Sequence, residues 1–283
     1  MIRVPWYVAW PVLTMAAFGA LHYFANRSLY FPSRYPEGFW GVQAQLGASD
    51  LWLQSDSGTR IHGWLIRLPE SRIMTLFLHG NAGNVTHRAL HAREITAAGS
   101  SILIIDYRGY GKSNGVPTEA GLYSDAEAAY QYLLSAGYRS GQIIVHGESL
   151  GTAVAVNLAS RRPCGALVLE ASFTSARDVA GTVLPVLGPL LIRSFDSRRR
   201  IGQVSVPILF LHGDRDEIVP MRLGQALFAA AHEPKKFCVV SGAGHNDIVE
   251  IAGPNYRQTL QSFYRGLPIP PSSNGGRNHG QTQ

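Results

Sequence analysis

The sequence predicts an α/β fold, in which helices cover both faces of a mostly parallel sheet. Short apolar runs rich in Ile, Leu and Val alternate along the chain with longer stretches of helical character. The runs are apolar throughout, without polar residues at alternate positions, which is typical of parallel strands buried on both faces. A hydrophobic content of 46% in 283 residues is enough for one large domain.

Each strand and helix of this fold has a recognisable segment in the sequence. The hairpin-like pair 51–54 and 60–68 comes first, and with six later apolar runs it brings the sheet to eight strands. The six runs are 74–78, 102–105, 143–145, 167–169, 208–211 and 237–240. Helices are expected between them, at 85–98, 118–136, 149–161 and 221–231.

The first residues predict a membrane anchor. From residue 4 to residue 25 the chain has no Asp, Glu, Lys or Arg, and aromatic residues lie toward both ends of this stretch. Its length is close to the roughly 20 residues that span a bilayer as a helix. We therefore expect residues 1–26 to be a single-pass anchor, in contact with a membrane and placing the protein there. The alternative is a signal peptide cleaved near residues 17–19, which would give a secreted or periplasmic protein.

Composition divides the remaining chain into three parts. Residues 27–47 resemble a linker, and residues 48–267 hold the predicted strands and helices. Residues 268–283 are rich in Pro, Gly, Ser and Asn, and they are expected to form a disordered tail because they carry too few apolar groups to offset the entropy of ordering.

Charge and cysteine content argue against two classes of protein. The formal net charge is +6, but the basic residues are scattered apart from the run 198–200. The sequence therefore lacks the basic stripe that is typical of nucleic-acid-binding proteins. The two cysteines, Cys164 and Cys238, lack the spacing of a zinc site or of a small disulfide-bonded domain. No nucleic-acid partner is expected.

One short pattern occurs at the ends of three predicted strands. LFLHG stands at 76–80 and again at 209–213, and the near copy IIVHG stands at 143–147. In open α/β sheets, functional groups gather beyond the carboxyl ends of the strands. A glycine directly after a strand allows a tight turn and close approach of the backbone. The three copies therefore predict three strand ends that contribute to one site.

The middle copy is the most specific signal in the chain. It continues as Gly147-Glu148-Ser149-Leu150-Gly151, which is G-x-S-x-G between a predicted strand and a predicted helix. This context is typical of a nucleophile elbow, with the serine hydroxyl exposed at its tip. The alternative is that Ser149 merely caps the helix. We predict Ser149 as a catalytic nucleophile.

A serine nucleophile needs a histidine base, and the order for this kind of elbow is Ser, then an acidic residue, then His. After the third strand end the chain offers three histidines. His232 closes a predicted helix and His279 lies in the tail, whereas His245 lies in the loop SGAGHND after a strand. His245 is therefore the predicted base.

The acid is expected in the loop after the third copy of the pattern. Asp216 is favoured because it lies further into this loop and can reach across to His245. Asp214 and Glu217 remain alternatives, since an Asp in such a loop often serves only to bind nearby backbone amides.

Taken together, HGESLG, LFLHGDRDEIVP and GAGHND resemble the α/β-hydrolase superfamily, and the resemblance extends over about residues 51–266. HGNAGN and DYRGYGKSNGVPTEAGLYSDAEAAY are similar to a branch of membrane-associated serine hydrolases that includes protein depalmitoylases. Depalmitoylases of this branch generally carry a cysteine-rich, lipid-modified amino terminus, and here an apolar stretch takes its place. The sequence also resembles serine aminopeptidase-like hydrolases.

The resemblance implies the α/β-hydrolase fold with a short cap at about 173–206, and it assigns roles to five residues. Ser149 would be the nucleophile, Asp216 the acid and His245 the base. The backbone amides of Asn81 and Leu150 would form the oxyanion hole. An apolar stretch in the cap, 184–192, could receive an acyl chain, touch a bilayer, or simply pack on the sheet.

These residues predict a serine hydrolase that cleaves carboxylic esters or thioesters, with acyl-chain substrates favoured, through an acyl-enzyme. This chemistry requires no cofactor and no metal. Two alternatives stay open at this point. One is hydrolysis of amides by a peptidase of the aminopeptidase-like type, and the other is a non-catalytic, membrane-tethered interaction protein on a hydrolase scaffold.

Overall fold

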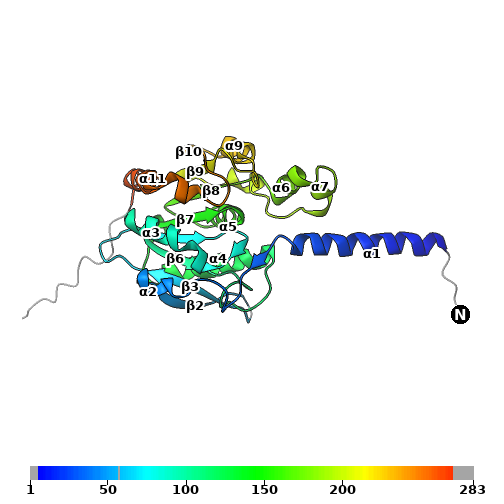
Figure 1. The fold of residues 1–283 in the computed structure, drawn as a ribbon, viewed down its shortest axis with the longest axis horizontal. Helices are drawn as coiled ribbons and strands as arrows, with labels where there is room; N and C mark the ends of the chain where they lie inside the picture. Colours follow the sequence, from blue (N-terminus) through cyan, green and yellow to red (C-terminus); the bar gives the residue numbers. More distant parts are fainter. Residues whose placement is uncertain (1–5, 57, 270–283) are drawn as a thin grey trace, which may run out of the picture.

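The computed structural model describes residues 6–56 and 58–269. Its centre is an eight-stranded sheet with the order β10-β9-β8-β7-β4-β6-β3-β2 and with helices on both faces (Figure 1). Only the pairings of β2 with β3 and of β3 with β6 are antiparallel among these strands. The predicted fold class, a mostly parallel sheet covered on both faces, is confirmed.

Every predicted strand forms within three residues of its expected ends. The strands of the sheet are β2 (Ser49–Gln54), β3 (Arg60–Ile66), β4 (Met74–Leu78), β6 (Ser101–Ile105), β7 (Ile143–Glu148), β8 (Ala166–Glu170), β9 (Ile208–Gly213) and β10 (Lys235–Val240). Strands β4, β6 and β8 are buried at every position, as continuous apolar runs predict.

Two groups of helices cover the two faces of the sheet. On one face lie α4 (Glu119–Ser135), α5 (Leu150–Ala159), α8 (Arg198–Ile201) and α9 (Met221–Ala230). On the other lie α3 (Ala89–Ala97), α10 (Ile248–Ala252) and α11 (Pro254–Arg265). Two short 3-10 helices, η1 (Val85–Arg88) and η2 (Ser140–Gln142), precede α3 and β7.

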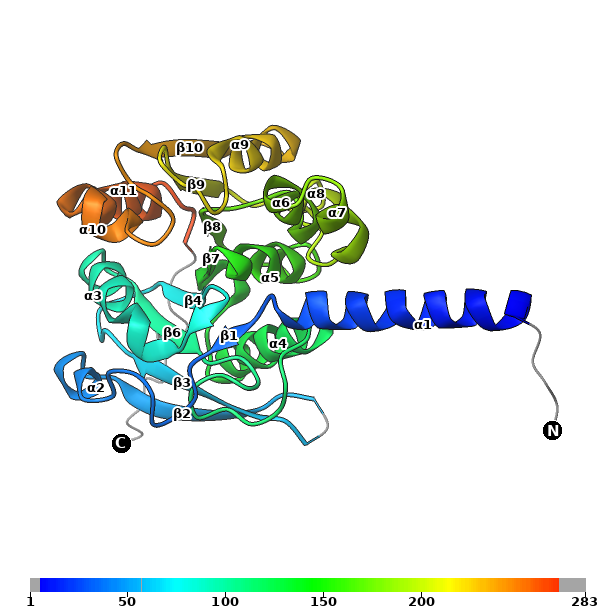
Figure 2. The same cartoon turned by 45° about the vertical axis from the view of Figure 1, so that its right-hand side comes forward.

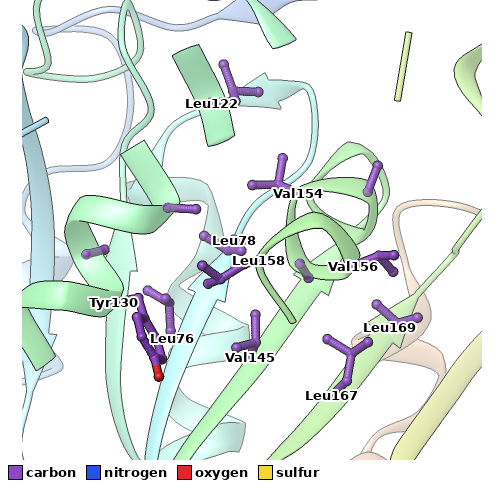
Figure 3. Packing of buried hydrophobic residues seen from close by; sticks show 14 of the residues in the cluster. Leu76, Leu78, Leu122, Tyr130, Val145, Val154, Val156, Leu158, Leu167 and Leu169 are labelled. Atoms are coloured by element: carbon purple, nitrogen blue, oxygen red, sulfur yellow. The ribbon is translucent and has the colours of Figure 1, made fainter. Parts of the chain in front are cut away.

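Alternate residues of each central strand point into two separate cores. Leu76 and Leu78 of β4 belong to the core under α4 and α5, whereas Phe77 belongs to the core on the opposite face. Leu76 is paired with Val145 of β7, and Figure 3 shows Leu76 next to Tyr130 of α4. Burial on both faces holds the strand ends in fixed positions, and the loops that follow them are thereby aligned along one edge.

From residue 6 onward the predicted anchor segment belongs to the helix α1 (Trp6–Arg27), which projects away from the sheet (Figure 2). Residues 1–5 lie outside the described residues. Across residues 6–56 and 58–269, however, no helix has both the length and the apolar character needed to cross a membrane. The prediction of a single-pass spanning helix is therefore not supported. The stretch lacks charge, but small and polar residues such as Thr14, Gly19 and His22 dilute its apolar content.

Residues 27–47, expected as a linker, lie against the sheet domain. They contain β1 (Phe31–Pro32), which pairs in parallel with β5 (Ala82–Gly83), and the short helix α2 (Val42–Gln45). Side chains from Leu29 and Tyr30 pack on one core, and Trp40 packs on the other. Of the predicted tail, the part from residue 270 onward lies outside the described residues.

The predicted cap segment connects β8 to β9 and contains two further short helices besides α8. They are α6 (Ala176–Val183) and α7 (Leu187–Leu191). Large apolar side chains are exposed along them, namely Val183, Leu184, Val186, Leu187 and Leu190. The side-chain nitrogen of Asn26 in α1 donates to the backbone oxygen of Leu191 at 3.0 Å, so α1 and α7 lie side by side.

Candidate active site

Ser149 occupies a sharp turn between β7 and α5. Its backbone has φ 50° and ψ −118°, a conformation that side-chain-bearing residues rarely adopt. A Cβ added to Gly151 would collide with the backbone oxygen of Leu78, and one added to Gly147 would collide with the backbone of Gly151. Gly151 is therefore required by the close approach of α5 to the end of β4, and Gly147 by the tight turn from β7 into α5.

The structure brings together the three residues that the sequence predicts as a triad. Oγ of Ser149 lies 2.8 Å from Nε2 of His245. Nδ1 of His245 lies 2.8 Å from Oδ2 of Asp216. Ser149 follows β7, Asp216 follows β9 and His245 follows β10, so three strand ends at one edge of the sheet supply the three side chains. This is the geometry that couples a nucleophile, a base and an orienting acid.

The Asp216 carboxylate is held in place by further donors. Its Oδ1 accepts hydrogen bonds from the backbone amides of Ile218 at 3.0 Å and Val219 at 2.7 Å. Burial alone would raise the pKa of Asp216, but hydrogen bonds from His212 and His245 outweigh it and hold this pKa well below its ordinary value. Asp216 is therefore a carboxylate at neutral pH, able to orient His245.

The alternative acids and bases lie elsewhere. Asp214 accepts from the amide of Gly242 at 2.7 Å and from the hydroxyl of Ser241 at 3.1 Å. Asp214 thus stabilises the loop that carries His245, and neither of these hydrogen bonds involves the imidazole ring. Glu217 and His232 are exposed on the surface. His279 lies outside the described residues.

Asn81 follows a glycine that lies beside the nucleophile, and Leu150 follows the nucleophile itself. A Cβ built on Gly80 would lie 3.4 Å from Cβ of Ser149, so the loop after β4 runs directly beside the serine. Within the described residues, the backbone amides of Asn81 and Leu150 donate to no acceptor. An oxyanion hole needs N–H groups that have no other acceptor, and the assignment of these two groups to it stays a prediction.

Sequence reasoning missed an ion pair beneath this loop. Nε of Arg88 donates to the carboxylate of Glu148, and Nη2 of Arg88 donates to the backbone oxygen of Ala82 at 3.2 Å. Burial would raise the pKa of Glu148, but the charge and hydrogen bond of Arg88 lower it. The pair joins the residue before the nucleophile to the loop after β4. Glu148 stands inside G-x-S-x-G, but nothing in the sequence pairs it with Arg88.

The described part of the chain holds no group of three or more His, Cys, Asp or Glu residues arranged to bind a metal. Two cavities of about 650 Å³ each lie away from the triad. One is lined by residues of α3 and α11, and the other by residues of β2, α4 and α5. Ser149, Asp216 and His245 line neither of them, so cavity volume does not identify this site and the side-chain geometry does.

Comparisons with known proteins place the chain in a family. The family model described as serine aminopeptidase, S33, matches residues 69–199. Protein bem46 of Schizosaccharomyces pombe is 35% identical over 271 residues, which cover 89% of each protein. The human alpha/beta hydrolase domain-containing protein 17B is 34% identical over 213 residues, covering 74% of this chain and 73% of the human protein. The chain belongs to the α/β-hydrolase superfamily.

Solved structures of other α/β-hydrolases share the fold. A Pyrococcus furiosus esterase superimposes with a TM-score of 0.72 at 18% identity, covering 84% of this chain and 97% of the esterase. An alpha-beta hydrolase from Vibrio vulnificus superimposes with a TM-score of 0.66 at 19% identity, covering 92% and 94%. The predicted superfamily and fold are thus confirmed, and the chain is a hydrolase by family.

Proposed function

We propose that this α/β-hydrolase is a serine hydrolase that cleaves carboxylic esters or thioesters of acyl chains. The observation that carries the proposal is the continuous line of contacts from Oγ of Ser149 through His245 to Asp216, with 2.8 Å at each step. A serine hydroxyl is a weak nucleophile, and a histidine held by a carboxylate is the arrangement that activates it.

In the proposed reaction, Nε2 of His245 takes the proton of the Ser149 hydroxyl as Oγ attacks the acyl carbonyl carbon. The amides of Asn81 and Leu150 donate to the resulting oxyanion, each worth roughly 3 kcal/mol of transition-state stabilisation. The carbonyl re-forms, and the leaving alcohol or thiol takes the proton from His245. Water then attacks the acyl-enzyme with His245 again as the base, releasing the acid and restoring Ser149.

The segment between β8 and β9 supports acyl chains as the substrate class. It leaves the sheet at the end of β8, the same edge from which Ser149, Asp216 and His245 project. Val183, Val186 and Leu187 in this segment expose more than half of their surface. Apolar side chains beside a hydrolytic centre favour contact with the hydrocarbon part of a substrate.

The experiment that tests the proposal measures p-nitrophenol release from acyl esters of increasing chain length, using the full chain. Ser149→Ala is the inactive variant, and Ser135→Ala is its control, since Ser135 is exposed on α4 and its hydroxyl donates to the backbone oxygen of Tyr132. We expect the wild type to turn over these esters with a chain-length optimum. Ser149→Ala should lower the turnover rate by several orders of magnitude, and Ser135→Ala should keep it.

Two outcomes would redirect the proposal. Faster cleavage of acyl or aminoacyl p-nitroanilides than of the matched esters would favour an amidase of the aminopeptidase-like type. Ester turnover that survives in Ser149→Ala would remove Ser149 from the mechanism.

A further inference from the structure

Residues 28–35, here called the strap, cross the loop that follows β4. Phe31 and Pro32 in the strap pair with Ala82 and Gly83. The amide of Ser33 donates to the oxygen of Gly83 at 3.0 Å, which continues the pairing beyond β1. Figure 2 shows the chain passing from α1 through β1 toward the centre of the domain. The strap thus covers the loop that contains Asn81.

The bonds from the strap converge on Asn81. The backbone oxygen of Asn81 accepts from the amide of Phe31 at 2.9 Å and from the hydroxyl of Tyr110 at 2.8 Å. Its side-chain nitrogen donates to the backbone oxygen of Leu29 at 3.1 Å. These three bonds fix the carbonyl and the side chain of Asn81. Its N–H is the group left without a partner among the described residues.

We propose that Leu29 and Phe31 are positioning residues of the oxyanion hole, acting through Asn81. This inference rests on the proposed function, in which the N–H of Asn81 stabilises the oxyanion. An oxyanion donor is effective only when it is held in place before the reaction, because any reorientation during the reaction lowers the gain. The strap supplies this rigidity from a segment that lies outside the sheet.

The strap is itself fixed at both ends. Just before the strap, the side-chain nitrogen of Asn26 in α1 donates a hydrogen bond to the backbone oxygen of Leu191 in α7 at 3.0 Å. Toward its other end, the side chain of Asn84 donates to the oxygen of Ser33 at 3.0 Å. The strap therefore connects the end of α1, and through it α7, to the loop that contains Asn81.

The test compares two substitutions at one position in the full chain. Phe31→Pro removes the amide that donates to Asn81, whereas Phe31→Ala keeps the amide and removes only a side chain that is 60% exposed. We expect Phe31→Pro to lower kcat for an acyl p-nitrophenyl ester by about 10-fold, a fraction of the effect of losing the donor itself. KM should stay nearly constant, and Phe31→Ala, which keeps the amide, should retain several times the kcat of Phe31→Pro.

A second variant and a second readout guard against a simple folding defect. Asn81→Ala keeps the oxyanion amide but loses the bond to Leu29, and it should lower kcat several-fold. An acyl trifluoromethyl ketone, which forms a tetrahedral oxyanion adduct with an active serine, should bind both variants more weakly by the same factors as kcat falls. A merely structural role would change the melting temperature without this proportionality.

The outcomes separate this inference from the proposed function. A wild-type protein that neither hydrolyses esters nor forms the ketone adduct would contradict the proposed function itself. A wild-type protein that does both, with Asn81→Ala folded and at full kcat and ketone affinity, would overturn the strap's role. Equal kcat in folded Phe31→Pro and Phe31→Ala would overturn it as well.

Discussion

Oγ of Ser149 lies 2.8 Å from Nε2 of His245, although the two residues are 96 positions apart in the chain. Ser149 is held at the end of a buried strand in the middle of the sheet, and His245 follows the edge strand β10. The contact therefore depends on the parallel alignment of β7, β8, β9 and β10, which brings their carboxyl ends to one edge.

Asp216→Asn should abolish most of the activity while leaving the fold intact. Asparagine can still accept from the amides of Ile218 and Val219, but it does not hold His245 in the tautomer that takes a proton from serine. We expect kcat to fall by roughly 10⁴-fold. The control is Asp214→Asn, at a carboxylate that braces the histidine loop without contacting the ring. Equal losses in the two variants, measured as kcat beside melting temperature, would contradict the orienting role of Asp216.

Ser149→Gly should be more stable than Ser149→Ala, by about 1 kcal/mol in the free energy of unfolding. The backbone at φ 50° and ψ −118° is strained for any residue with a Cβ, and glycine relieves this strain. Urea denaturation gives the difference. Ala120→Gly, in the exposed first turn of α4, is the reference with the opposite sign, because glycine is a poorer helix former than alanine. A Ser149→Gly variant less stable than Ser149→Ala would refute a strained elbow.

The Arg88 and Glu148 pair should show strong coupling in a double-mutant cycle. Both side chains are largely buried, so Arg88→Gln alone leaves a carboxylate without its counter-charge and should cost about 3 kcal/mol of stability. Glu148→Gln in the same chain removes that charge and should recover part of the loss. Urea denaturation of the two single variants and the double variant measures the coupling. Additive losses would show that the pair does not connect the elbow to the loop after β4.

The free energy of unfolding should decrease above pH 6.5 because His91 loses its proton there. Burial alone would lower the pKa of His91, but the Glu170 carboxylate beside it raises this pKa above the ordinary 6.5. A folded-state pKa above the unfolded one stabilises the fold fully below pH 6.5 and loses this effect as pH rises through the raised value.

The measurement is urea denaturation from pH 5 to pH 8 for the wild type and for His91→Gln. We expect the wild type to lose more stability than the variant across the upper part of this range. His232→Gln, at an exposed position after α9, should behave like the wild type. Parallel curves for wild type and His91→Gln would exclude an effect of His91.

The strands were predictable because their signal is local. Each continuous apolar run, such as 74–78, reflects burial on both faces, and the glycine that ends it reflects the turn that follows. The positions of Ser149, Asp216 and His245 followed from a spaced motif and from chain order. The structure places these residues in contact, and their catalytic roles stay predictions.

Contacts between distant segments were beyond the sequence. The bond from Asn81 to Leu29 joins residues 52 positions apart, and the pair of Arg88 with Glu148 joins residues 60 apart. Neither contact follows from apolar spacing or composition. Because the contact of Leu29 with Asn81 has no signal in the sequence, residues 27–47 resemble a linker. The anchor prediction rests on the length of residues 4–25, on their lack of charge and on aromatic residues toward both ends, and none of these makes a helix apolar enough to span a bilayer.

The central claim is that Ser149 becomes covalently acylated during turnover. The direct measurement mixes the full-length protein with an acyl p-nitrophenyl ester, quenches it with acid within the first turnovers, and locates any acyl group by peptide mass spectrometry. We expect the acyl mass on the peptide that contains Ser149, and none on that peptide from Ser149→Ala. Ester turnover with an unmodified Ser149, or with the acyl group on another residue, would contradict it.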